Sequence, residues 1–298
     1  SSGMSQANLV QSDLQTVAPY SKYAMNFDGT DYINCGNDSS LNMADNGTDS
    51  FTFSFWIKRG STNNEIIISK QVNGGSYNGF ETSLISNKIR VFLGSFQSPT
   101  AYLQVISTNT ITGSDWKNVV ITYDGSQNVN GFNIYINKVP ETLSALKTDI
   151  PSGVLNSANF QISGRSGLTL YDGSISNLSY WNTALTSAQV TEIYNQGLPS
   201  NLNSHSAYSN LVSWWQLGEN SSFDGNDWIV ADEKGSNNGT STGMPVGALT
   251  NGVGTTANGV SSGMSEGNLV GDAPYSTANA LSTNMVVTSR VTGSGNTP

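Results

Sequence analysis

The glutamates of this chain are candidates for acid–base chemistry. Hydrolysis of a glycosidic bond needs two carboxylates placed about 5 to 9.5 Å apart across it. A strand can supply such a set as Glu-x-Asp-x-Glu, since alternate side chains point to the same face. The chain contains no triplet of this kind. The carboxylates therefore do not indicate a glycosidase. Five glutamates have no acidic neighbour two or four positions away: Glu65, Glu81, Glu141, Glu192 and Glu219.

The single histidine, His205, lies among serine and asparagine residues in an expected loop. No cysteine or second histidine stands near it, so neither a catalytic triad nor a zinc site is indicated. The sequence also lacks a phosphate-binding loop and a dinucleotide-binding fingerprint. We therefore predict that the protein is not an enzyme.

An aromatic-Asp-Gly tripeptide occurs four times and predicts tight turns. In such a turn the aspartate accepts hydrogen bonds from nearby backbone N–H groups, and the glycine supplies a positive φ. This turn role is the interpretation that we favour for Asp124. The tripeptides are 27–29, 123–125, 171–173 and 223–225.

Strand signals dominate the elements that must position these turns. The segment 51–57 alternates strictly, with Phe51, Phe53, Phe55 and Ile57 on one face, which we expect to lie in a core. Many short strands separated by turn residues are typical of a β-sandwich or jelly roll. The other predicted strands are 24–27, 32–35, 65–69, 80–85, 88–93, 101–106, 116–123, 131–137, 160–163, 173–180 and 211–217.

One helix is predicted between residues 186 and 197. Thr186 can cap its start, with Gln189 three residues later as the partner in a capping box, and Gly197 is well placed to end it. An apolar stripe on the helix would face the core rather than a partner protein. That stripe consists of Val190, Ile193 and Tyr194.

Several separated motifs resemble one family. The stretch 171–182 combines an aromatic-Asp-Gly turn, an alternating strand and an aromatic pair, and a capped helix follows it. It looks like the closing strand of concanavalin A-like lectin and laminin G-like jelly rolls, and the likeness extends over about residues 24–240. The resemblance implies an all-β, concanavalin A-like two-sheet jelly-roll sandwich with one short helix and extended terminal arms. The other motifs that carry it are 27–32, 51–58 and 115–125.

The same resemblance implies a structural calcium ion. Laminin G-like and pentraxin-like domains hold calcium between turn carboxylates and backbone carbonyls, and a hard cation of this kind prefers oxygen ligands. On that basis we expect Ca²⁺ to be bound within the set Asp28, Asp31, Asp172 and Asp232. The alternative is that each aspartate only stabilises its own turn.

Sugar recognition would need exposed aromatic rings that stack on pyranose faces. The candidates in or near loops are Tyr77, Phe96, Tyr102, Tyr171 and Tyr208. For each of them, packing inside the protein is the alternative. The strand tryptophans are expected in the core.

The segment 211–219 departs from the family pattern, because it resembles the opening strand of such domains but comes last. It pairs either within the same sandwich, as in a circularly permuted unit, or with a neighbouring unit. We favour pairing within the sandwich, since an unpaired Trp214–Trp215 strand would expose a large apolar edge.

A sequence repeat brackets the predicted sandwich. Ser-Ser-Gly-Met-Ser at 1–5 recurs at 261–265, Asn-Leu-Val at 8–10 recurs at 268–270, and Ala-Pro-Tyr-Ser at 18–21 recurs at 273–276. We expect an N-terminal arm at 1–20, a lectin-like sandwich at 21–240, and a C-terminal linker and arm at 241–298 with the second copy at 261–276. A duplicated linker without function is the alternative. The arm residues predicted to mediate assembly are Met4, Leu9, Pro19, Tyr20, Met264, Leu269, Pro274 and Tyr275.

The composition limits the partners. Charged residues make up 11% of the chain and the net charge is −9, which argues against binding of nucleic acid or anionic membranes. No apolar run approaches the roughly 20 residues of a membrane-spanning helix, so no membrane insertion is expected. The only cysteine, Cys35, is expected to be a small buried hydrophobe. A polar, uncharged surface is typical of extracellular and virion β-proteins.

Two functions fit these observations. The first is a structural or adhesive protein of an extracellular particle, such as a phage capsid decoration, tail fibre or surface filament, that assembles with copies of itself or other subunits through its arms. The arms and the polar composition resemble marine tailed-phage virion proteins with lectin-like domains. The alternative is a carbohydrate-binding module or adhesin that recognises cell-surface or algal glycans.

Overall fold

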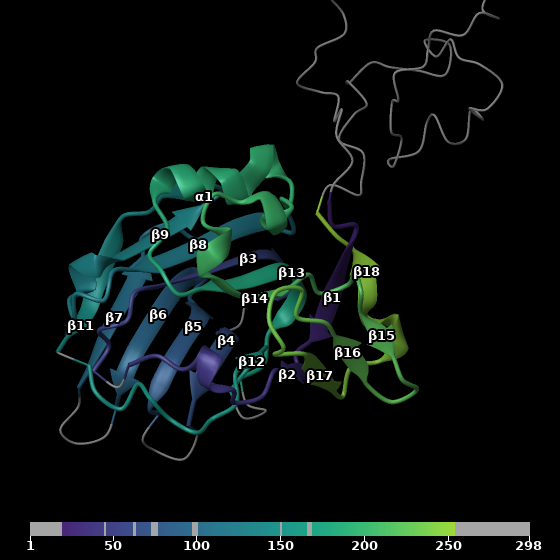
Figure 1. The fold of residues 1–298 in the computed structure, drawn as a ribbon, viewed down its shortest axis with the longest axis horizontal. Coiled ribbons are helices and arrows are strands. Elements are labelled where there is room, and N and C mark those ends of the chain that lie inside the picture. Colours follow the sequence, from purple (N-terminus) through teal and green to yellow (C-terminus); the bar gives the residue numbers. More distant parts are fainter. Residues whose placement is uncertain are drawn as a thin grey trace, which may run out of the picture.

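The computed structural model describes residues 20–253, apart from 45, 62–63, 73–76, 97–100, 150 and 166–168. In this part of the chain two antiparallel sheets face each other across one hydrophobic core, and the helical turns lie outside them (Figure 1). The predicted all-β jelly-roll sandwich with one short helix is confirmed. The arm residues Met4, Leu9, Pro19, Met264, Leu269, Pro274 and Tyr275 lie outside the described residues.

The first sheet follows the order β10-β9-β8-β3-β13-β1-β18, and β14 also pairs with β13. Its members are β1 (Tyr23–Asp28), β3 (Phe51–Arg59), β8 (Lys117–Tyr123), β9 (Phe132–Ile136), β10 (Val139–Pro140), β13 (Asp172–Trp181), β14 (Leu211–Trp215) and β18 (Leu249–Asn251).

The second sheet follows the order β11-β7-β6-β5-β4-β12-β2-β17-β16-β15. Its members are β2 (Tyr32–Asn34), β4 (Glu65–Gln71), β5 (Gly79–Ile85), β6 (Lys88–Ser95), β7 (Ala101–Ser107), β11 (Leu143–Thr148), β12 (Gln161–Ile162), β15 (Ser222–Phe223), β16 (Trp228–Val230) and β17 (Gly239–Thr242).

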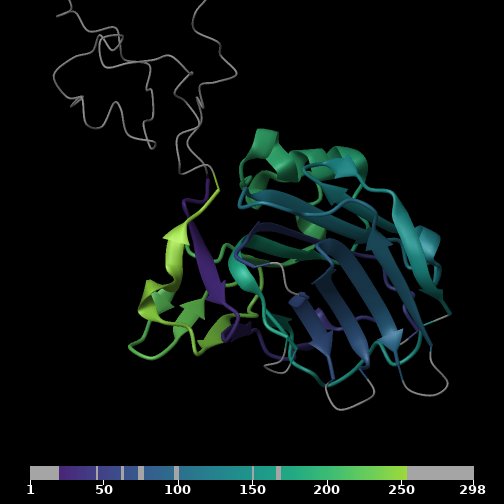
Figure 2. The same cartoon turned by 180° about the vertical axis from the view of Figure 1, so that it is seen from behind.

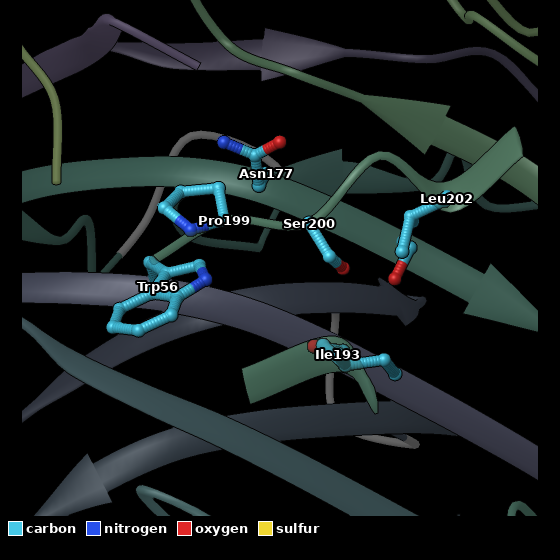
Figure 3. A pocket seen from close by; sticks show the side chains of 8 residues that line it. Trp56, Asn177, Ile193, Pro199, Ser200 and Leu202 are labelled. Carbon is cyan, nitrogen blue, oxygen red and sulfur yellow. The ribbon is translucent and has the colours of Figure 1, made fainter. Parts of the chain in front are cut away.

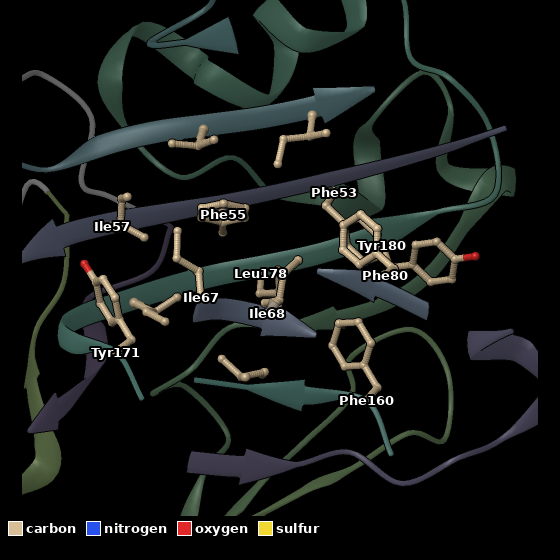
Figure 4. Close-up of a cluster of buried hydrophobic side chains, with 14 of the residues drawn as sticks. Phe53, Phe55, Ile57, Ile67, Ile68, Phe80, Phe160, Tyr171, Leu178 and Tyr180 are labelled. Atoms are coloured by element: carbon tan, nitrogen blue, oxygen red, sulfur yellow. The ribbon is translucent and has the colours of Figure 1, made fainter. Parts of the chain in front are cut away.

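The core forms where period-two faces of the two sheets meet (Figure 4). On β3, Phe51, Phe53, Phe55 and Ile57 are all fully buried in this cluster, as predicted. The ring of Phe53 stacks on Phe80 of the opposite sheet with centroids 4.7 Å apart. Because rings from both sheets interlock, burial of the aromatic face holds the two layers together.

The predicted helix is α1 (Ser187–Tyr194). Its capping box is present, since the Gln189 N–H donates to Thr186 Oγ1 and the Thr186 N–H donates to Gln189 Oε1. The helix ends at Asn195, whose φ of 41° is left-handed, and Gly197 ends the 3-10 turn that follows, η5 (Asn195–Gly197). The other one-turn 3-10 helices are η3 (Ser39–Leu41), η4 (Val129–Gly131), η6 (Leu202–Ser204), η7 (Tyr208–Asn210) and η8 (Val246–Ala248). None of the helices in the described part of the chain is long and apolar enough to cross a membrane.

The outer face of the first sheet carries a second hydrophobic cluster under α1 and the turns around it (Figures 1 and 2). Strands β3, β8 and β13 are therefore buried on both faces. The members of this cluster are Val120, Tyr135, Trp181, Leu185, Val190, Ile193, Leu202, Ala207, Leu211 and Trp214.

The Trp-Trp strand pairs inside the sandwich, as predicted. Leu178 of β13 faces Trp215 of β14, and both Trp214 and Trp215 are buried. The Trp215 indole N–H donates to the carbonyl of Asn237 at 2.6 Å. The strand therefore leaves no exposed apolar edge.

The folded body extends beyond residue 240. Strand β18 pairs with β1 in the first sheet, with Tyr23 opposite Asn251. The predicted boundary between sandwich and linker was therefore wrong, because residues 249–251 complete a sheet rather than join an arm. The pairing also brings the start and the end of the described chain side by side.

Candidate functional site

The outer face of the second sheet differs from that of the first, because polar and charged side chains occupy it. Along β5, Phe80 and Leu84 belong to the core, so the alternate residues Glu81 and Ser83 point outward. The register places Phe92 of β6 opposite Glu81.

Two guanidinium groups converge on Glu81, whose side chain is only 1% exposed. Arg165 Nη1 lies 2.7 Å from Glu81 Oε2, and Arg90 Nη2 donates to Glu81 Oε1. Arg165 Nη1 also donates to Gln71 Oε1, and Arg90 Nε to Ser83 Oγ. A buried carboxylate with two bound arginines fixes the orientation of both guanidinium planes.

Aromatic rings adjoin this network. Phe96 lies 4.5 Å from both Phe92 and Tyr102 and 5.8 Å from Tyr77, centroid to centroid. Phe92 is buried, whereas the other three rings are half-buried and accessible. The Arg165 guanidinium lies over Tyr77, with 4.4 Å from Cζ to the centroid. We call Tyr77, Phe96, Tyr102, Arg90 and Arg165, with Glu81 beneath them, the arginine-aromatic patch.

The patch brings together three of the aromatic residues predicted for sugar binding, but not the other two. Tyr171 is fully buried in the core, and its hydroxyl donates to the Lys58 carbonyl at 3.1 Å. Burial raises the pKa of Tyr171 well above its usual value. The prediction for Tyr171 is wrong, because no sugar can reach that ring. Tyr208 is half-buried against the cluster on the first sheet, under Lys234 Nζ, so it lies apart from the patch.

Three of the four predicted calcium ligands gather at one corner. Asp28 of β1 and Asp172 of β13 are register partners, and the Asp28 N–H donates to Asp31 Oδ1 at 3.2 Å. Asp31 is fully buried, and its Oδ2 has no hydrogen-bond partner among the described residues. Burial, reinforced by the charges of Asp28 and Asp172, raises the pKa of Asp31 to about 6. An orphaned carboxylate oxygen beside like charges fits a cation.

The corner does not supply a full set of carboxylates. Within the described residues no three histidine, cysteine or acidic side chains are arranged to hold one metal ion. Asp28 Oδ1 already accepts from the Thr30 N–H and hydroxyl. An ion here would therefore be bound by Asp31 together with backbone or water oxygens, rather than by several aspartates.

Asp232 does not belong to this corner. Its Oδ1 accepts backbone N–H groups of Trp214, Lys234 and Gly235, and its Oδ2 accepts that of Asn237. The carboxylate joins β14 to the turn that follows β16. The structure therefore does not bring Asp232 together with Asp31, and both oxygens of Asp232 are engaged by backbone N–H groups.

Three other residues have structural surroundings, as expected for the turn residue Asp124 and for the buried Cys35. Asp124 Oδ1 accepts the Ser126 N–H at 2.9 Å, as a turn residue does. His205 is buried, with Nε2 3.0 Å from the Gln189 carbonyl and Nδ1 accepting the Ala207 N–H. Cys35 is buried and unpaired, and burial raises the pKa of its thiol.

Two cavities were not predicted from the sequence. One, between the first sheet and α1, has a volume of about 10 Å³ and is lined by Trp56, Asn177 and Pro199 among others (Figure 3). That volume holds at most one water molecule. The other is an open cleft of about 220 Å³ beside Arg59 and Asn87. Its lining comes from loops after β3, β5 and β7, whose approach no local pattern reveals.

The two-sheet sandwich agrees with a family assignment made from the sequence. The family model for the concanavalin A-like lectin/glucanases superfamily matches residues 27–191. The chain belongs to this superfamily. No curated protein sequence matches it.

Solved structures resemble this lectin-like chain in fold. A candidate carbohydrate-binding protein from Bacteroides ovatus is 19% identical with a TM-score of 0.55; the match covers 78% of this chain and 60% of that one. The chain thus spans less than two thirds of that protein. A heptameric SAP-like pentraxin from Limulus polyphemus is 16% identical over 80% of this chain and 97% of its own, with a TM-score of 0.43.

Proposed function

We propose that this lectin-like protein binds glycans through the arginine-aromatic patch and does not cleave them. The observation that carries the proposal is the convergence of Tyr77, Phe96 and Tyr102 beside two arginines that one buried glutamate fixes. Membership of the superfamily supports it, as does the likeness in fold to a candidate carbohydrate-binding protein.

The patch offers the two kinds of contact that sugars need. Half-buried rings present apolar surface for the C–H face of a pyranose. The two guanidinium groups supply charged N–H donors, since the Arg90 and Arg165 side chains remain 21% and 15% exposed. The side chains are held in place before a ligand arrives, which lowers the entropy cost of binding.

The same geometry argues against hydrolysis at the patch. A glycosidase needs one carboxyl that donates a proton and a second that attacks or activates water. Glu81 is the carboxylate of the patch, and each of its oxygens is bound by an arginine. It therefore positions the arginines and takes no part in acid–base chemistry.

The test is a glycan array probed with the full chain and with Tyr102→Ala. Loss of one stacked ring should weaken binding about tenfold, in line with roughly 1 kcal/mol or slightly more per aromatic contact. Tyr208→Ala is the matched control, because that tyrosine is also half-buried but lies over the first sheet. Equal losses in the two variants, or no glycan bound by the parent, would overturn the proposal.

We also propose that Asp31, with Asp28 or Asp172, holds a structural Ca²⁺. The orphaned Asp31 Oδ2 and the raised pKa of this carboxyl support it. The ion would supply positive charge that relieves repulsion between the aspartates. It would stabilise the corner between β1 and β13 and has no part in sugar contact.

A role in an extracellular or virion particle is a second proposal, specifically supported by one observation. Because Tyr23 pairs with Asn251, both segments that carry the repeat leave the body at one corner. A glycan-binding body tethered there suits an adhesive subunit. Deletion of 261–298 should abolish assembly but leave the body folded; particles that still form would refute the particle role.

A further inference from the structure

The corner where the chain enters the first sheet holds Tyr20 and Ser21 by specific side-chain contacts. The Tyr20 ring stacks on Trp214, with centroids 5.8 Å apart and planes 22° from parallel. Ser21 Oγ donates to Glu219 Oε2 at 2.6 Å. The backbone N–H groups of Lys22 and Tyr23 both donate to Glu219 Oε1. We call Trp214 and Glu219 the arm cradle.

The cradle contacts one aromatic ring and one hydroxyl. A tyrosine ring and a serine hydroxyl are the side-chain groups that it contacts, whereas Lys22 and Tyr23 contribute backbone N–H groups that other residues also have. Ser21 is fully buried, but Tyr20 remains 42% exposed. Tyr20 and Ser21 lie before β1 and pair with no strand of the described chain, so they can leave without breaking the sheet.

The body behind the cradle is fixed. A Cβ on Gly218 would lie 2.4 Å from Tyr23 Cβ, and one on Gly252 would lie 2.5 Å from the Tyr23 carbonyl oxygen. The Gly252 N–H donates to the Lys22 carbonyl. Because the Tyr23 backbone lies against Gly218 and Gly252 and pairs with Asn251, any exchange of the arm stops at Ser21.

The sequence contains a second candidate for the cradle. Ala-Pro-Tyr-Ser at 18–21 recurs as Ala-Pro-Tyr-Ser at 273–276, within the longer repeat. Tyr275 and Ser276 therefore offer the same ring and hydroxyl in the same order. The residues that follow differ, since Thr277 and Ala278 stand where Lys22 and Tyr23, the first residue of β1, follow Ser21.

We propose that the arm cradle is a docking site for residues 273–276 of a second copy of this chain, which replace Tyr20 and Ser21. The chain leaves the body at this same corner, because β18 pairs with β1. The twenty peptide units from Val253 to Ala273 can span about 65 to 70 Å when extended, enough to reach a neighbouring copy. Exchange of near-identical segments costs little, since the incoming tyrosine and serine can form the same stacking and hydrogen bond as the pair they displace.

The first experiment tests the cradle. A fluorescent peptide of residues 268–277 is titrated into the full chain carrying both Tyr20→Ala and Tyr275→Ala, which empties the cradle of its own tyrosines. We expect saturable binding, at least tenfold weaker for the same peptide with Tyr275→Ala, and also at least tenfold weaker when Glu219→Gln is added to the chain. The chain with Tyr275→Ala alone keeps Tyr20 and should bind the peptide at least tenfold more weakly.

The second experiment tests the occupant by sedimentation velocity. The full chain with Tyr20→Ala should self-associate, and the chain with both tyrosines replaced should be a monomer. Absence of peptide binding to the doubly substituted chain, with its melting temperature unchanged, would overturn the cradle. Peptide binding with a monomeric Tyr20→Ala chain would mean that 273–276 docks on its own body, which would overturn the role of a second copy.

Discussion

The two outer faces of the sandwich have opposite characters. On the first sheet, Val120, Trp181 and Trp214 point away from the core but are buried under α1 and its neighbouring turns. On the second sheet, polar and charged side chains point outward beside the aromatic rings of the patch. There the buried carboxylate of Glu81 pairs with two arginines, and no helix of the described chain covers it. The apolar outer face of the first sheet is thus covered by α1 and its turns. The outer face of the second sheet carries an ion-pair network that leaves aromatic rings accessible.

The contrast shows where function can lie in a two-layered fold. A face whose tryptophans are covered by the protein's own segments offers no open surface to a glycan, and uncovering it would cost stability. A face whose centre is polar can exchange water for sugar hydroxyls at little cost to the fold. Substitutions on the two faces should therefore separate, with stability lost on the first sheet and binding lost on the second.

Trp181→Ala should give the largest effect on stability. The side chain is fully buried in the outer cluster and packs against His205, with centroids 4.6 Å apart. Removing a buried tryptophan leaves a cavity and should lower the free energy of unfolding by about 3–5 kcal/mol, measured by urea denaturation. Phe96→Ala on the other face is the control and should cost about 1 kcal/mol or less. Similar losses in the two variants would contradict the contrast between the faces.

Glu81→Gln should come next and should affect both stability and binding. Two arginines would lose their shared carboxylate, and breaking a buried pair in this way costs about 3 kcal/mol. Because the guanidinium groups would also lose their fixed orientation, glycan binding should fall. Asp149→Asn is the control: Asp149 pairs with Lys147 at 2.7 Å but is 42% exposed, so the change should be within about 0.5 kcal/mol. A fully stable Glu81→Gln variant would show that the arginines need no counterion.

Asp31 should make stability depend on pH between about 4 and 6. Its pKa is raised in the folded state, so the folded protein binds more protons than the unfolded chain in this range. Stability should therefore fall, by about 2 kcal/mol, as the pH rises from 4 to 6. Calcium should restore part of the loss at pH 7. Asp31→Asn should reduce the slope, to which Glu65 also contributes because burial raises its pKa, and should remove the calcium effect. Urea denaturation with and without chelator measures both, and an unchanged slope would argue against Asp31 as a source.

The sequence was sufficient where a local rule determines the structure. Alternation alone placed Phe51, Phe53 and Phe55 in the core, and the spacing of Thr186 and Gln189 identified the helix start. The two-sheet jelly-roll class followed from the family motifs, but the strand order of the sheets did not.

The centre of the patch could not be predicted from the sequence. Glu81 and Arg165 are 84 residues apart and meet only when β5 and the loop after β12 come together in the second sheet. The prediction that Tyr171 binds sugar failed for a related reason. Its turn motif matches exposed turns, whereas its ring points into the core. Local sequence predicts a turn but not the direction of the side chain that flanks it.

Thr186→Ala should produce the smallest of these effects and tests how firmly the cover of the first sheet is held. Loss of the side-chain oxygen that accepts the Gln189 N–H should cost about 1 kcal/mol. Because α1 covers the outer face of the first sheet, glycan binding at the arginine-aromatic patch on the second sheet should be unchanged. Urea denaturation and the glycan array together check this. A Thr186→Ala variant that lost binding while keeping its stability would mean that the two faces are coupled through the core, and that the separation between cover and binding surface does not hold.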